Sequence, residues 1–181
     1  MKKIILSGIF LLSFIMGKGQ FTSATLQASG LTCALCAKAI FTNLTALKFV
    51  ENVDTDLNTS TFLISFKPGN EISPDQIKTK VEAAGFSVSN LVLTFTANGQ
   101  TVSQQSPLKI GNTYFHFIQA KSNVLSGTVK MQIIDKGYVG TKEFKKLLAG
   151  NKLACYQSLE IADCPNTENI TSSTTYHVII K

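Results

Sequence analysis

The chain has 181 residues and a formal net charge of +6 at pH 7, which is long enough for one large domain or two small ones with modest cores. Its 17 basic residues are all lysines. Because arginine is the residue best suited to forked contacts with phosphate and guanine, this composition argues against nucleic acid as a partner.

The first 19 residues have the pattern of a secretory signal peptide. Lys2 and Lys3 form a basic start, the apolar run Ile4–Met16 follows, and small residues up to Gly19 form a cleavage site. The run is shorter than the roughly 18 residues that a membrane-spanning helix needs. We therefore expect an exported, soluble protein, periplasmic or secreted, with no transmembrane segment in the mature chain.

The next segments predict a strand, a cysteine loop and a helix. Thr22–Ala28 alternates apolar and polar residues, as a half-buried strand does, and Ala34–Leu47 carries apolar residues at helical spacing. Cys33 precedes this helix and Cys36 lies in its first turn, where unpaired backbone N–H groups and the helix dipole favour a thiolate. The two sulfurs are therefore suited either to hold a metal ion or to exchange disulfides.

Four more elements follow before residue 97. Val50–Leu57 and Thr61–Lys67 predict a hairpin, since a short polar turn joins them. Ser73 predicts a helix start, Gly85 ends that helix, and Phe86–Phe95 predicts a final strand. The order of elements is that of the ferredoxin-like βαββαβ fold, an antiparallel sheet with both helices on one face.

These residues also resemble a known family. The run Gly30–Cys36 reads GLTCALC, apolar residues recur along the helix after it, and Ala84-Gly85-Phe86 precedes the last strand. This pattern closely resembles the heavy-metal-associated domain of copper chaperones, of copper-ATPase amino-terminal domains and of the periplasmic mercury-binding protein. The resemblance covers residues 22–95 and implies that Cys33 and Cys36 are the metal ligands, within a domain that we place at residues 21–96.

Two further positions bear on the resemblance: Leu31 departs from the family pattern, and Phe86 lies at a position where members of the family differ from one another. Leu31 stands where the family usually has Met, a residue that packs beneath the metal loop, so Leu is expected to substitute with little loss. Phe86 stands where the family has a residue close to the metal. An aromatic ring there is expected either to shield the metal or to be an ordinary core residue.

Two thiolates select soft ions. Cu(I), Ag(I) and Hg(II) are satisfied by two sulfurs in near-linear geometry, whereas Zn(II) requires four ligands. We expect a non-enzymatic protein that captures Cu(I), or alternatively Hg(II) or Ag(I), on Cys33 and Cys36, for sequestration or for transfer to a metal-transporting membrane ATPase or another CxxC protein. The alternative is a thiol–disulfide oxidoreductase, although neither Pro nor Gly stands between the cysteines.

Residues 97–181 predict a second domain after a turn-rich linker at residues 97–100. Strands are expected at Thr113–Ala120, Leu125–Asp135 and Thr175–Ile180, with weaker ones at 100–110 and 153–159, and Thr141 begins a short helix. This order predicts a small β-rich barrel similar to the oligonucleotide/oligosaccharide-binding (OB) fold, and an α+β class for the whole chain. In a further alternative, this basic half is an interaction adaptor.

The second half contains the other two cysteines and both histidines. Cys155 and Cys164 predict a structural disulfide, since exported proteins form such bonds. The alternative is a second metal site with His116 or His177. A histidine within a strand is more often a hydrogen-bonded core residue than a ligand.

Overall fold

The computed structural model describes residues 20–31, 33–104, 106–120, 123–150, 155–156 and 175–181. The helices are α1 (Ala34–Thr45), α2 (Pro74–Ala83) and α3 (Thr141–Gly150). The strands are β1 (Gln20–Ser29), β2 (Val50–Asp56), β3 (Thr61–Phe66), β4 (Ser87–Val102), β5 (Leu108–Ile110), β6 (Thr113–Phe117), β7 (Asn123–Ile133) and β8 (Thr175–Ile180). The proposed signal peptide lies outside the described residues.

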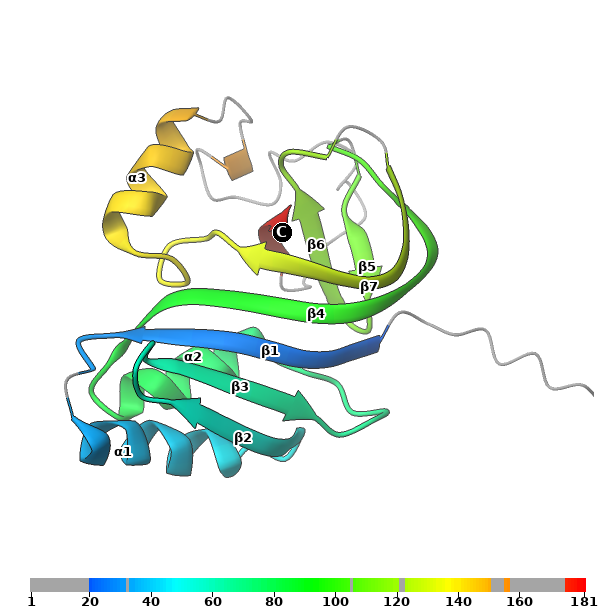
Figure 1. Cartoon of the computed structure of the whole chain (residues 1–181). Helices are drawn as coiled ribbons and strands as arrows, with labels where there is room; N and C mark the ends of the chain where they lie inside the picture. The colour runs from blue at the N-terminus through cyan, green and yellow to red at the C-terminus, as the bar shows by residue number, and fades with distance from the viewer. Residues whose placement is uncertain (1–19, 32, 105, 121–122, 151–154, 157–174) are drawn as a thin grey trace, which may run out of the picture.

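One open sheet of eight strands runs through the described part of the molecule, in the order β2-β3-β1-β4-β7-β8-β6-β5. Its first four strands are antiparallel and, with α1 and α2, form the predicted βαββαβ arrangement. Figure 1 shows α1 and α2 on the same face of these strands, and the side-chain amide of Asn43 on α1 donates to the carbonyl of Lys80 on α2 at 3.0 Å. The ferredoxin-like prediction is confirmed.

The two helices form because their apolar residues recur at helical spacing and their starts are capped. Ile40 and Leu44 on α1 and Ile77 on α2 are fully buried against the sheet. The hydroxyl of Ser73 accepts a hydrogen bond from the backbone N–H of Gln76 at 3.2 Å, as an N-cap does. Each predicted helix therefore has the start and the buried face expected from its sequence.

The predicted linker at residues 97–100 is wrong, because those residues belong to β4. β4 pairs with β1 on one side and with β7 on the other, and Ala97 faces Gly127 while Gln100 faces Leu125. The register shifts between Asn98 and Gln100, which leaves Gly99 unmatched at a φ of +82°. The turn-like residues therefore produce a β-bulge, which bends a strand without ending it.

The second half contains the predicted strands β6, β7 and β8 and the helix α3. The weaker prediction at residues 100–110 is only partly correct, since among its described residues strands cover 100–102 and Leu108–Ile110. Of the strand predicted at 153–159 the structure describes only Cys155 and Tyr156, which are helical; the other residues of that prediction lie outside the described part. The OB-like barrel is not confirmed. Among the described residues β5 pairs only with β6, and β4 is shared between the two halves, so the sheet continues instead of starting a separate barrel.

A second small core lies under α3. It contains four buried residues and the partly buried apolar stripe of the helix, which was predicted from Phe144, Leu147 and Leu148. The buried members are Ile118, Ile134, Val139 and Tyr156. No helix in the described part of the chain is both long enough and apolar enough to cross a membrane.

Candidate metal centre

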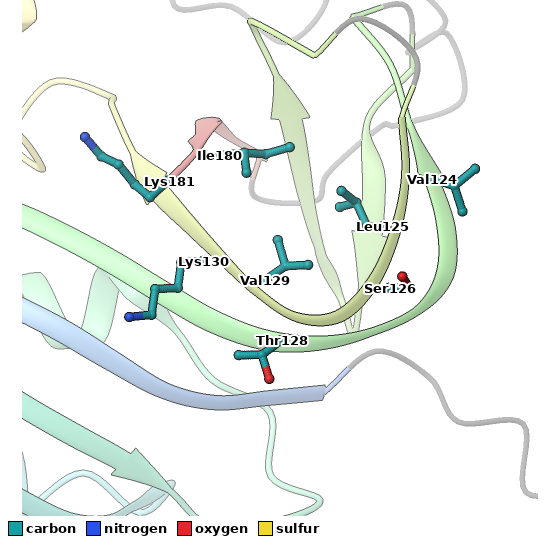
Figure 2. Close-up of a pocket in the computed structure, with 8 residues that line it drawn as sticks. All are labelled: Val124, Leu125, Ser126, Thr128, Val129, Lys130, Ile180 and Lys181. Carbon is teal, nitrogen blue, oxygen red and sulfur yellow. The ribbon is translucent and has the colours of Figure 1, made fainter.

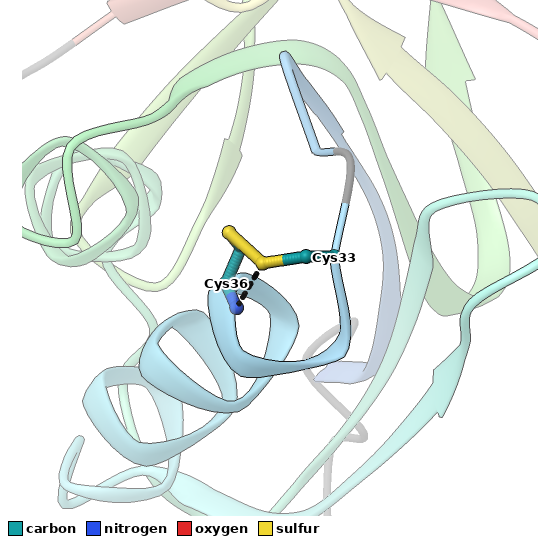
Figure 3. Close-up of a disulfide and its surroundings, with 2 residues drawn as sticks. All are labelled: Cys33 and Cys36. Carbon is teal, nitrogen blue, oxygen red and sulfur yellow. Dashed lines mark hydrogen bonds between the residues drawn. A yellow bond between two sulfur atoms is a disulfide. The ribbon is translucent and has the colours of Figure 1, made fainter.

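The loop between β1 and α1 places the two predicted ligands. Gly30 adopts a φ of +79°, a conformation that other residues rarely take, and so turns the chain directly after β1. Cys33 is the N-cap residue of α1, and its Sγ accepts a hydrogen bond from the backbone N–H of Cys36 at 3.2 Å (Figure 3). The sequence positions both cysteines at the start of the helix, as predicted.

Cys33 and Cys36 are joined by a disulfide, and their Cα atoms are 5.3 Å apart. Cys33 is exposed and Cys36 is half-buried. Figure 3 shows the two sulfurs together above the first turn of α1. The structure thus brings the predicted pair together at the surface, in its oxidised form.

The surroundings of the pair favour negative charge on sulfur. The first turn of α1 contains no acidic residue, and its backbone N–H groups point toward the cysteines at the positive end of the helix dipole. A hollow of about 170 Å³ lies beside Cys33 and is lined also by Leu31, Ala34, Leu57 and Ser60. After reduction, the site would present two thiolates to an approaching ion without a competing carboxylate in that turn.

Leu31 and Phe86 are both half-buried and pack against the main core. Leu31 therefore contacts the core beneath the loop, as expected for the residue at this position. Phe86 has the same kind of contact, which matches the simpler of its two interpretations.

Comparison with protein families identifies this half of the molecule. Residues 25–87 match the family model of the heavy-metal-associated domain, which spans the strands, helices and cysteine loop described above. Residues 25–87 form a heavy-metal-associated domain. The matched segment contains both Cys33 and Cys36, so the cysteine pair lies within this heavy-metal-associated domain.

Solved structures similar to the chain match little more than a third of it. The yeast copper transporter domain Ccc2a, determined in apo and Cu(I)-loaded states, is 34% identical over 37% of this chain and 90% of that one, with a TM-score of 0.34. Oxidised MerP from Ralstonia metallidurans is 21% identical over 39% and 96%, with a TM-score of 0.35. The metallochaperone CopZ is 21% identical over 37% and 98%, with a TM-score of 0.34. No curated protein matches the chain.

The structure also brings together three side chains that the sequence places far apart. His116, Cys155 and His177 are all buried and lie next to one another in the second half. Burial is the largest cause of a lowered pKa of His116, which keeps this ring neutral near pH 7. The sequence offered a metal site with His116 or His177 only as the alternative to the Cys155–Cys164 disulfide, and the pairing of the strands that carry the two histidines was not predicted.

Cys155 is disulfide-bonded, and its predicted partner Cys164 lies outside the described residues. The structure therefore agrees with a disulfide at Cys155 and describes nothing of its other end.

A larger hollow of about 340 Å³ lies along β7 and the end of β8 (Figure 2). Apolar side chains and two lysines line it together with Ser126 and Thr128; the apolar ones are Val124, Leu125, Val129 and Ile180, and the lysines are Lys130 and Lys181. The side chains of this lining include no carboxylate, thiol or imidazole. The chemistry of the described residues therefore concentrates at the cysteine loop and at the histidine cluster.

Proposed function

We propose that this is an exported protein that binds Cu(I) through Cys33 and Cys36 in their reduced form. The observation that supports this most directly is the surface pair of cysteines at the positive end of α1, within a heavy-metal-associated domain. The basic and apolar pattern of the first 19 residues supports export to the periplasm or beyond.

The donor set favours Cu(I) over zinc. Two thiolates satisfy a soft ion of low coordination number, whereas Zn(II) requires four ligands, and the residues that share the hollow with Cys33 supply no carboxylate, thiol or imidazole. Hg(II) and Ag(I) have the same preference for sulfur and are the alternative ions. Direct competition between these ions at the reduced pair would rank them.

Transfer to a partner fits an exposed site of low coordination. A third thiolate from a partner adds to the bound ion before one of the original two leaves, so the ion moves without ever being free. Leu35, between the two cysteines, is 80% exposed and offers an apolar contact to that partner. A metal-transporting membrane ATPase or another CxxC protein would be suitable, and sequestration is the alternative fate.

Cu(I) can bind only after the disulfide between Cys33 and Cys36 has been reduced. A dithiol reductant supplies two electrons, its own sulfurs become a disulfide, and two protons pass to Cys33 and Cys36. Cu(I) then displaces those protons, because the thiolate is the ligand. Copper capture by this protein therefore depends on the redox state of its compartment.

Titration of the reduced protein with Cu(I), under anaerobic conditions and against a chromophoric chelator, tests the proposal. The Cys33→Ser/Cys36→Ser variant should bind one equivalent less than the wild type. Leu35→Ala is the matched control, since it alters the same loop without removing a sulfur and should leave the stoichiometry unchanged. Equal stoichiometry in the wild type and the double serine variant would refute the proposal.

The disulfide itself favours a second candidate, thiol–disulfide exchange. An exposed CxxC disulfide at a helix N-terminus is also the arrangement of dithiol oxidoreductases. Insulin reduction and the reduction potential of the pair separate the two functions. A protein that binds Cu(I) but does not accelerate insulin reduction is a metal carrier, and the reverse result supports the oxidoreductase.

A further inference from the structure

Strand pairing brings the two histidines of the chain side by side. β6 and β8 run parallel, and His116 and His177 are register partners, with ring centroids 5.7 Å apart. Both side chains are buried, as is Cys155, which reaches them from the segment after α3. One potential ligand atom from each of the three residues lies within 4.8 Å of the others.

In each histidine ring, the nitrogen that points away from the cluster lies within hydrogen-bond distance of an oxygen atom. His116 Nε2 lies 2.9 Å from the backbone carbonyl oxygen of Gln104, and His177 Nδ1 lies 2.7 Å from Oδ1 of Asp135. Because both oxygens accept hydrogen bonds, these nitrogens carry protons, and in the neutral form of each ring the other nitrogen has a lone pair. Metal-binding histidines are oriented in this way, with the outer N–H bonded to a carbonyl or a carboxylate.

The supporting contacts fix the cluster on several sides. His116 Nδ1 lies 3.6 Å from Cys155 Sγ. Asp135 also accepts a hydrogen bond from the backbone N–H of His177 at 2.8 Å, so the carboxylate fixes both the strand and the ring. The ring of Tyr156 makes an edge contact with the ring of His177, with centroids 5.2 Å apart, and its hydroxyl donates to the carbonyl of Ile134 at 2.8 Å. The cluster is therefore rigidly supported and shielded from water.

We infer that His116, Cys155 and His177 form a second, buried copper site, which can bind the metal once the disulfide of Cys155 is reduced. Two imidazole nitrogens and one thiolate in a trigonal arrangement are a donor set that copper favours, while zinc would require a fourth ligand. This site is independent of the cysteine pair in the heavy-metal-associated domain.

The disulfide of Cys155 must be reduced before its sulfur can bind copper. A dithiol transfers two electrons to the disulfide of Cys155, becomes a cyclic disulfide itself, and leaves a proton on each released protein sulfur. Cu(I) then replaces the proton on Cys155. Because the same sulfur is used either for the disulfide or for the metal, oxidation and copper binding exclude each other.

The test uses the full chain with Cys33→Ser/Cys36→Ser, in which the first site is absent. After reduction with dithiothreitol and anaerobic desalting, this protein should bind one equivalent of Cu(I) against a chelator, and the oxidised protein should bind none. X-ray absorption of the loaded protein should show two nitrogen ligands and one sulfur ligand. An all-sulfur environment, or no binding after reduction, would overturn the inference.

Variants then assign the ligands. Cys155→Ser and His177→Gln in the same background should each abolish the binding of this one equivalent of Cu(I) in competition with the chelator. Asp135→Asn keeps an oxygen acceptor but not its charge, so it should weaken binding about 10- to 100-fold while the spectrum still shows two nitrogens and one sulfur. Unchanged affinity in Asp135→Asn, or full binding without Cys155, contradicts the assignment. Cys155→Ser in the wild-type background loses only this second equivalent, so failure here is distinguishable from failure of the Cys33 and Cys36 site.

Discussion

Tyr138 lies where the first half of the molecule contacts the second, and its hydroxyl is the group to remove. It is 3% exposed and donates a hydrogen bond to Oδ1 of Asp75 at the start of α2. Lys78 lies 5.4 Å above its ring, and the ring of Tyr176 is 5.6 Å away. Tyr138→Phe keeps these ring contacts and removes the hydroxyl that donates to Asp75.

The expected loss follows from the nature of that bond. A hydrogen bond to a charged group contributes about 1.5–3 kcal/mol. Asp75 is exposed and is rehydrated when its partner is lost, so the lower part of that range applies, roughly 1.5–2 kcal/mol. For a chain of this size, that predicts a fall in Tm of about 3–8 °C.

Urea unfolding followed by circular dichroism measures the change. Tyr114→Phe is the matched control, because Tyr114 is half-buried and its ring contact with Lys109, at 5.2 Å, does not involve the hydroxyl. The control should lie within about 0.5 kcal/mol of the wild type, as surface substitutions do. If Tyr138→Phe is as stable as Tyr114→Phe, the hydrogen bond from Tyr138 to Asp75 does not contribute to the stability of the fold, and the reasoning is refuted.

Four further outcomes are expected. Leu44→Ala, in the fully buried face of α1, should lower the free energy of unfolding by about 2–5 kcal/mol in urea. Ser73→Ala removes the cap of α2 and should cost about 1 kcal/mol, again in urea. Burial is the largest cause of raised pKa values for Tyr138, Tyr156 and Tyr176. The unfolded chain therefore loses these protons first, near pH 10, so the free energy of unfolding should fall above that pH by up to about 1.4 kcal/mol per pH unit for each tyrosine. Tyr156→Phe should make this fall with pH less steep. A free energy of unfolding that stays constant up to about pH 11 would contradict the prediction. A fragment ending at Thr96 cuts β4 and removes its partner β7, so its Tm should be lower than that of the full chain; an equal Tm would show that the first half is independent.

Local signals in the sequence predicted the first half well. The cap at Ser73, the stop at Gly85 and the apolar stripes of α1 and α2 depend on interactions within a few residues, and all of them appear as expected. The cysteine pair was equally accessible to prediction, because three residues of separation at a helix start place the sulfurs together in any such loop.

The second half was predicted less well because its organisation depends on distant pairing. Gly99 has the sequence signal of a turn, yet the strand continues past it because β7 supplies partners on both sides of the bulge. A glycine at positive φ suits a tight turn and a β-bulge alike, so only the neighbouring strand distinguishes the two here.

The sequence by itself determined the ferredoxin-like order of elements and the surface pair of cysteines, since both arise from local periodicity, capping and spacing. Only the tertiary structure decided that His116 meets His177 and Cys155. Their contact depends on the parallel pairing of β6 with β8 and on the packing of the chain after α3. No local preference of the residues encodes which distant strand will be a neighbour.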